Sequence, residues 1–171
     1  MIKAVIVVNN HGKPRFIKFY DEIPEEKRIK LVKEVFQKIT QRGDVLCNFL
    51  DGTHVSTEIA DWSSDIKFVY RHFATLYFIF VIDSSESELG TLDLIQVFVE
   101  ALDQAFENIC ELDIIFHPDR VLYILDQMIM GGLVFETDIK QIVFISEECD
   151  RLADEAKIKG QGRDKDPSFR K

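Results

Sequence analysis

The sequence has few of the residues that build disulfide frameworks and metal sites. It contains three cysteines in 171 residues, and none of them belongs to a C-x-x-C pair. The four histidines are scattered along the chain, without the spacing of zinc ligands: His11, His54, His72 and His117. We therefore expect reduced thiols in a cytosolic protein that holds no metal and needs no cofactor.

The sequence also lacks the residue groupings that carry catalysis. No glycine-rich loop joins a predicted strand to a helix, and the pair Gly131-Gly132 follows a predicted helix, so we expect no phosphate-binding loop. Cys110 has no obvious partner base. Glu111 and Asp113 are paired carboxylates in a segment expected to be extended, and we favour a structural or capping role for them over general acid–base work. We predict that the protein is not an enzyme.

Long apolar runs and an excess of positive charge are missing as well. The apolar run at 76–82 is far shorter than the roughly 20 residues of a membrane-spanning helix. The run at 2–8 is short and contains Lys3, unlike a signal peptide. The formal net charge of -9 argues against direct attraction to nucleic acid or to an anionic membrane. We predict a cytoplasmic protein that other molecules hold at a membrane.

The composition that remains is that of a folded domain. Hydrophobic residues make up 46% of the chain and phenylalanine alone numbers 14, enough for a sizeable core in one domain. Short apolar and β-branched segments predict five strands: 2–8, 15–20, 45–50, 65–73 and 76–83. The first and the last are apolar at successive positions, which is typical of strands covered on both faces.

Helical periodicity dominates the middle of the chain. An amphipathic helix is expected at 92–109, with Thr91 as its candidate cap. A turn-like segment (111–118) then leads to a second helix, whose first residue is a proline. The Gly131-Gly132 pair is expected to stop this second helix.

Two further helices complete the prediction. One is expected at 24–43, and the other follows Thr137 and runs from 138 to about 158. Residues 159–171 are rich in glycine and charge, and we expect them to be disordered. The chain is accordingly divided into a core (1–137), a C-terminal helix and a tail.

Strands early in the chain and helices later predict an α+β fold. Consecutive strands with short links favour an antiparallel meander. Residues 53–64 lack periodicity and are expected to form an irregular connection. Trp62, Phe68 and Tyr70 either fill the domain's own core or contact a neighbouring protein, and periodicity leaves both interpretations open.

Four segments, in order, resemble the small (sigma) subunits of the heterotetrameric clathrin-adaptor complexes: MIKAVIVVNNHGKPRFIKFY, VYRHFATLYFIFVID, FVEALDQAFENICELDIIF and ILDQMIMGG. The motif NNHGKPR and the long segment between Cys47 and Ile66 most resemble the small subunit of adaptor protein complex 3. The resemblance covers 1–137. It implies a longin-like fold, a five-stranded sheet with helices on both faces, and a role in vesicle-mediated transport from the Golgi and endosomes to lysosomes.

The resemblance also implies partners. In this family the small subunit packs permanently against a large subunit, here of the delta type, beside beta and mu subunits in the same heterotetramer. An Arf-class GTPase and phosphoinositide lipids would then hold the whole complex peripherally on Golgi, endosomal and vesicle membranes.

A binding site follows from the same resemblance. Sigma subunits, together with their large partner, bind dileucine sorting signals of the form [DE]-x-x-x-L-[LI] in cargo tails. The residues that match the family's leucine pockets are Ala74, Leu76, Val99, Asn108, Ile109, Leu112 and Ile114. Arg15 matches the basic residue that faces the acidic side of the signal. Ile109 and Ile114 stand where valine and leucine are common.

Each of these residues also has a plainer interpretation. The apolar ones suit an ordinary core, Asn108 suits a helix end, and Arg15 can pair with an acidic neighbour. A free-standing longin-type trafficking regulator or tether subunit, without a cargo pocket, therefore remains the alternative function. A SNARE-type regulator is disfavoured because 139–171 lacks sustained heptads and a membrane anchor.

Overall fold

The structure is a computed structural model, and it describes residues 1–42, 48–55 and 65–163. Five strands form one antiparallel sheet, in the order β2-β1-β5-β4-β3. Their bounds are β1 (Ile2–Asn9), β2 (Pro14–Phe19), β3 (Phe49–Asp51), β4 (Lys67–Phe73) and β5 (Leu76–Ile82). The predicted α+β class and the five-stranded antiparallel sheet are confirmed.

The sheet is not the simple meander that short connections favour. Strand β1 lies between β2 and β5, because the connection through α1 (Glu25–Thr40) carries the chain from one edge of the sheet to the other. Nearly every residue of β1 is buried, which explains its unbroken apolar run. Strand β3 covers only the end of the strand predicted at 45–50, and residues 43–47 lie outside the described part.

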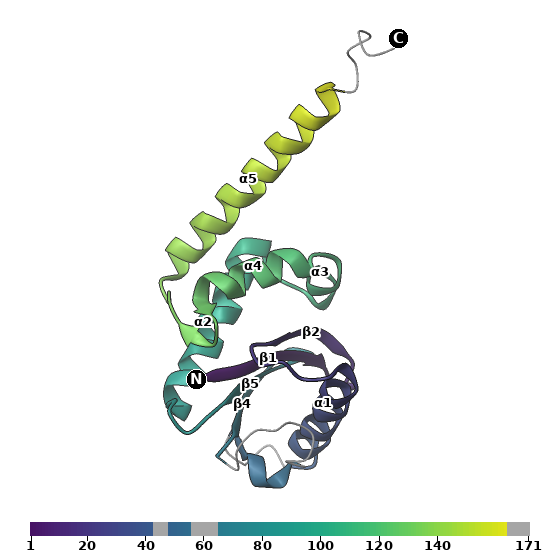
Figure 1. Cartoon of the computed structure of the whole chain (residues 1–171), viewed down its shortest axis with the longest axis vertical. Helices are drawn as coiled ribbons and strands as arrows, with labels where there is room; N and C mark the ends of the chain where they lie inside the picture. The colour runs from purple at the N-terminus through teal and green to yellow at the C-terminus, as the bar shows by residue number, and fades with distance from the viewer. Residues whose placement is uncertain (43–47, 56–64, 164–171) are drawn as a thin grey trace.

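Helices cover both faces of the sheet (Figure 1). Helix α1 packs on one face, over a core that includes Ile6 and Ile79. The other face carries α2 (Glu88–Phe106), α3 (Glu111–Phe116) and α4 (Pro118–Met128) over a larger core. The predicted first residue of α4, a proline, is confirmed.

Two aromatic residues that were candidates for a partner surface belong to the domain's own core. Phe68 is 2% exposed and Tyr70 is 8% exposed, and both pack in the cluster under α1. The interpretation as core therefore holds for these two. Trp62 and most of the irregular connection predicted at 53–64 lie outside the described residues, apart from a short 3-10 helix at Gly52–His54.

The segment predicted as a turn between α2 and α4 is helical instead. Glu111 and Asp113 occupy the first turn of α3, so the expectation of an extended segment is wrong. The cause is a local cap, in which the Asp113 carboxylate accepts from the backbone N–H of Cys110 at 2.8 Å. Carboxylates in a first turn also face the positive end of the helix dipole, which favours so short a helix.

The Gly131-Gly132 pair does not end a helix. Helix α4 ends at Met128, and the glycines form the turn of a small hairpin, β6 (Ile129–Met130) and β7 (Leu133–Val134). Their φ values are 59° and 84°, the pair of positive angles that a two-residue hairpin turn requires. The same residue pair suits a helix stop and a hairpin turn, which is why periodicity alone misassigned it.

Helix α2 begins four residues before the helix expected at 92–109, and Ser87, not Thr91, is its cap. The Ser87 hydroxyl oxygen accepts from the N–H of Gly90 at 3.2 Å. Thr91 is buried inside the first turn, where its hydroxyl donates to the Ser87 carbonyl oxygen at 2.8 Å.

Replacing Ser87 by alanine is expected to lower the free energy of unfolding by about 1 kcal/mol, because one N–H at the helix start loses its acceptor. Urea unfolding measures the change. Ser87→Asp retains an acceptor and should stay close to the unchanged protein. Equal losses in the two variants would contradict the capping role.

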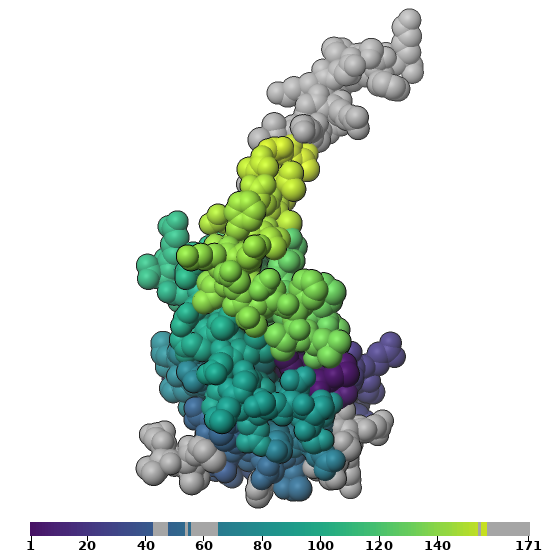
Figure 2. Space-filling view, turned by 90° about the vertical axis from the view of Figure 1, so that its left-hand side faces the viewer, coloured from purple at the N-terminus to yellow at the C-terminus, as the bar shows by residue number. Residues whose placement is uncertain are grey.

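Helix α5 (Ile139–Arg163) leaves the domain and is longer than the helix predicted to end near 158. The Asp138 carboxylate accepts from a backbone N–H of its first turn, that of Lys140. Ile142 is fully buried and α5 starts against α2 and α4, whereas its later turns stand clear of the domain (Figure 2). The disorder predicted for 159–171 is wrong for 159–163, which belong to α5, and stays a prediction for 164–171, which lie outside the described part.

Candidate functional site

The eight predicted site residues come from four neighbouring parts of the fold. Arg15 lies on β2, while Ala74 and Leu76 belong to the β4–β5 turn and the start of β5. Val99 lies on α2, and Asn108 and Ile109 follow the end of that helix. Leu112 and Ile114 lie on α3.

An ion pair joins the first of these parts to the last. The Nε–H of Arg15 donates to Oε1 of Glu111 at 2.6 Å, and both side chains are about three-quarters buried, at 22% and 26% exposure. Glu111 is therefore the acidic neighbour that the plainer interpretation of Arg15 requires. In Figure 1, α3 lies beside β2, as this contact requires.

Glu111 also holds the β4–β5 turn and the end of β1. Thr75 donates its hydroxyl hydrogen to Oε2 of Glu111 at 3.5 Å, and Asn9 donates a side-chain N–H to Oε1 at 3.1 Å. Partial burial raises the pKa of Glu111, but hydrogen bonds from Asn9 and Arg15 outweigh this effect, so the pKa is lowered. Glu111 therefore stays ionised at neutral and mildly acidic pH.

The orientation of Asn9 is set by the β1–β2 turn. Its side-chain oxygen accepts from the N–H groups of His11 at 3.0 Å and Lys13 at 2.9 Å. Because the oxygen end is occupied in this way, the NH₂ end is the one that faces Glu111. Asn9 is only 4% exposed, so a buried amide is fixed with its donor directed at the carboxylate.

The end of α2 explains Asn108 without a ligand. Glu107 and Asn108 adopt φ values of 52° and 80°, and the N–H of Asn108 donates to the Asp103 carbonyl oxygen at 3.1 Å. Asparagine tolerates this left-handed conformation better than most residues. The Asp103 carboxylate then accepts from the N–H of Ile109 at 3.2 Å, which directs the chain toward α3.

The apolar candidates differ in how much of each is available to a ligand. Leu76 and Ile114 are buried in the core beneath α2, and Val99 and Ile109 are half-buried against the same core. Leu112 is 58% exposed. A peptide side chain at this place could therefore contact Leu112 directly and Val99 and Ile109 in part, whereas Leu76 and Ile114 offer almost no accessible surface.

Sequence reasoning missed the residues that organise this region, namely Asn9, Thr75 and Glu111. The signal for Asn9 was present, because Asn9-Asn10-His11-Gly12 is turn chemistry and a first asparagine commonly accepts from the next backbone N–H groups. The signal for Glu111 was an acidic residue at the start of a helix, but the helix itself was not predicted.

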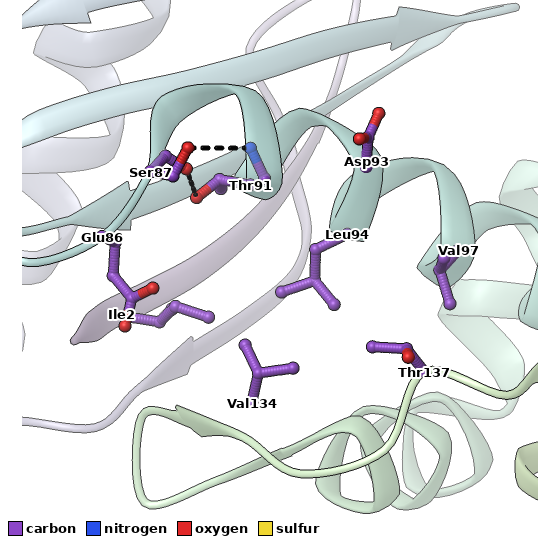
Figure 3. Close-up of a pocket in the computed structure, with 10 residues that line it drawn as sticks. Ile2, Glu86, Ser87, Thr91, Asp93, Leu94, Val97, Val134 and Thr137 are labelled. Atoms are coloured by element: carbon purple, nitrogen blue, oxygen red, sulfur yellow. Dashed lines mark hydrogen bonds between the residues drawn. The ribbon is translucent and has the colours of Figure 1, made fainter.

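A cavity of about 360 Å³ lies elsewhere, between the start of α2, the start of β1 and β7. Ile2, Leu94 and Val134 point toward one another in it, while Glu86 lies at its border (Figure 3). None of the eight predicted site residues lines it. In the described part of the chain, no group of His, Cys, Asp and Glu side chains could hold a metal ion.

No helix among residues 1–42, 48–55 and 65–163 combines the length and the apolar character needed to cross a bilayer. The start of β1 is held against the β6–β7 hairpin, because the N–H of Ile2 donates to the Gly132 carbonyl oxygen at 2.8 Å. Figure 2 accordingly shows the first residues, in purple, against the green segment that contains the hairpin.

Comparison with known proteins gives a match to one family over most of the chain. The sequence profile described as "Clathrin adaptor complex small chain" matches residues 1–153. The chain is 55% identical over 152 residues to "AP-3 complex subunit sigma-2" of Homo sapiens, covering 89% of this chain and 76% of that protein. It is 51% identical over 156 residues to "AP-3 complex subunit sigma" of Dictyostelium discoideum, covering 91% and 89%.

A structural comparison agrees. A chain of the full-length AP-3 complex in a stretched open conformation, itself a homology model, superimposes with a TM-score of 0.70 at 38% identity. The match covers 93% of this chain and 99% of that one. The predicted longin-like α+β fold is confirmed, because a five-stranded antiparallel sheet with helices on both faces is consistent with an adaptor small chain and the chain superimposes on a subunit of such a complex.

Proposed function

Because the chain belongs to the clathrin adaptor complex small chain family, we propose that it is the small subunit of an AP-3-type adaptor complex that selects cargo for vesicles. Small chains of this family are structural trafficking proteins and not enzymes, in agreement with the prediction. The proposed route leads from the Golgi and endosomes to lysosomes and related organelles. The complex, and not this chain alone, sits peripherally on those membranes.

The proposed direct partner is a large subunit of the delta type, with beta and mu subunits in the same heterotetramer. Support comes from large apolar side chains that stay exposed near the hairpin and on α5: Phe135 (70%), Phe144 (62%) and Leu152 (55%). Aromatic side chains, such as the two phenylalanines, are enriched at protein–protein interfaces. The net charge of -9 is consistent with membrane attachment through the partners, an Arf-class GTPase and phosphoinositides.

The proposed ligand is a dileucine signal, [DE]-x-x-x-L-[LI], in a cargo tail. The observation that carries this proposal is the Arg15–Glu111 pair, because it brings the basic residue of the site against the helix that holds Leu112. A signal bound there would place its leucines over Leu112, Val99 and Ile109, with its acidic residue toward Arg15. Burial of apolar surface would supply most of the affinity.

A peptide titration tests the site. A fluorescent peptide containing Glu-x-x-x-Leu-Leu is added to this chain co-expressed with a delta-type large-subunit trunk. We expect saturable binding on the order of 10–100 μM, because each buried leucine contributes about 1.5–3 kcal/mol and ordering the flexible peptide offsets much of it. Leu112→Asp should weaken binding at least about tenfold, and its side chain is exposed enough for the fold to tolerate the change.

Leu89→Asp is the matched control. Leu89 is 70% exposed on the first turn of α2 and is not among the predicted site residues, so this variant should bind as the unchanged protein does. Both variants must co-purify with the large subunit. Equal binding by all three proteins would remove the pocket from this place, and a chain that is stable alone and forms no heterodimer would favour the free-standing regulator.

A further inference from the structure

The carboxylate of Glu111 already pairs with the positive charge that the acidic residue of the proposed signal would contact. Arg15 is the basic residue that would face the signal's acidic residue, and its Nε–H is already bound to Glu111 at 2.6 Å. The pair carries no net charge. An acidic peptide residue approaching Arg15 therefore meets a neutralised guanidinium and a fixed negative charge beside it.

Glu111 is held in this position by more than Arg15. The buried amide of Asn9 and the hydroxyl of Thr75 donate to its two carboxylate oxygens, at 3.1 Å and 3.5 Å. Asn9 cannot turn away without leaving the backbone N–H groups of His11 and Lys13 without their acceptor. The negative charge is therefore part of the folded domain and does not depend on the arginine rotamer.

Arg15 nevertheless keeps one edge for a second carboxylate. The ion pair uses its Nε–H, and in the described part of the chain its two Nη groups contact no acceptor. A guanidinium can donate to two carboxylates along different edges. The signal's acidic residue can thus bind at the Nη edge while Glu111 remains in place.

We propose that Glu111 is a specificity-determining residue that weakens the preference of the site for an acidic residue in the sorting signal. This inference rests on the proposed function. Glu111 acts on the peptide through charge, by neutralising Arg15 and by repelling a second carboxylate. Signals with a neutral residue at that position consequently lose less affinity than they would at an unpaired arginine.

The test removes one negative charge from the protein and, separately, one negative charge from the peptide. Glu111→Gln keeps an oxygen that can accept from Arg15 and Asn9 and an NH₂ group that can donate to Thr75, but it removes the charge. Two peptides, Glu-x-x-x-Leu-Leu and Gln-x-x-x-Leu-Leu, are titrated into the unchanged and the Glu111→Gln heterodimers. We expect the affinity ratio of the Glu peptide to the Gln peptide to rise about threefold to tenfold in the variant, with the Gln peptide nearly unchanged.

Asp113→Asn is the matched control. It removes a negative charge from the same helix, but its carboxylate contacts the Cys110 N–H and not Arg15, so the peptide ratio should stay as in the unchanged protein. A ratio that stays the same or falls in Glu111→Gln overturns the proposal, as does an equal rise in Asp113→Asn. Absence of binding by both peptides to every heterodimer would instead refute the dileucine site itself.

Discussion

Replacing Gly132 by alanine is expected to lower the free energy of unfolding by about 2–5 kcal/mol. The residue has a φ of 84°, where an L side chain costs about 1–2 kcal/mol. A Cβ atom would lie 2.4 Å from the carbonyl oxygen of Ile2, a backbone atom that cannot rotate away. Relieving the overlap displaces the start of β1. By analogy with the cost of overpacking a core, this displacement costs about 1–3 kcal/mol more.

The neighbouring glycine supplies the control for this prediction. Gly131 has a φ of 59°, but a Cβ placed on it has no neighbouring atom within 4 Å. Gly131→Ala should therefore show only the backbone strain, about 1–2 kcal/mol. Urea unfolding of both variants separates the backbone strain from the steric overlap, because both variants carry the strain and only Gly132→Ala carries the overlap. Equal losses would show that contact with Ile2 contributes nothing.

The contact of Gly132 with Ile2 also explains part of what the sequence could not reveal. Periodicity found β1 and β5, because strands buried on both faces are apolar at successive positions, and this pattern needs no knowledge of neighbours. The pairing of β1 with the distant β5, and the contact of its first residue with a hairpin far along the chain, depend on tertiary structure. Local patterns carry no information of that kind.

The missed helix α3 shows the same limit on a smaller scale. Six residues are too few for a clear helical period, and Leu112, Ile115 and Phe116 leave much of their apolar surface exposed. The helix is stabilised by the capping bond from Cys110 to Asp113 and by the contacts of Glu111 with the sheet edge. The family resemblance accordingly supplied the candidate residues of the site, Arg15 among them, but not Glu111, the carboxylate that pairs with Arg15.

Phe98→Ala is expected to have the largest effect of all, a loss of about 3–5 kcal/mol in the free energy of unfolding. Phe98 is fully buried on α2, and its ring meets those of Phe78 at 6.0 Å and Phe80 at 6.2 Å between centroids. Its removal leaves a cavity between helix and sheet that the close-packed core cannot fill by small shifts. Thermal unfolding of the purified heterodimer measures the loss.

The ring contacts continue from Phe98 to the candidate site, which gives this substitution a second consequence. Phe78 packs edge-on against Phe73 at 5.9 Å, and Phe73 directly precedes Ala74 in the β4–β5 turn. Loosening α2 should therefore weaken peptide binding together with stability, whereas Leu112→Asp should affect binding alone. Phe98→Leu retains most of the volume and should cost less than about 1.5 kcal/mol, with binding preserved. If Phe98→Ala binds the peptide at full strength while unfolding at a lower temperature, the site does not depend on how α2 is seated on the sheet.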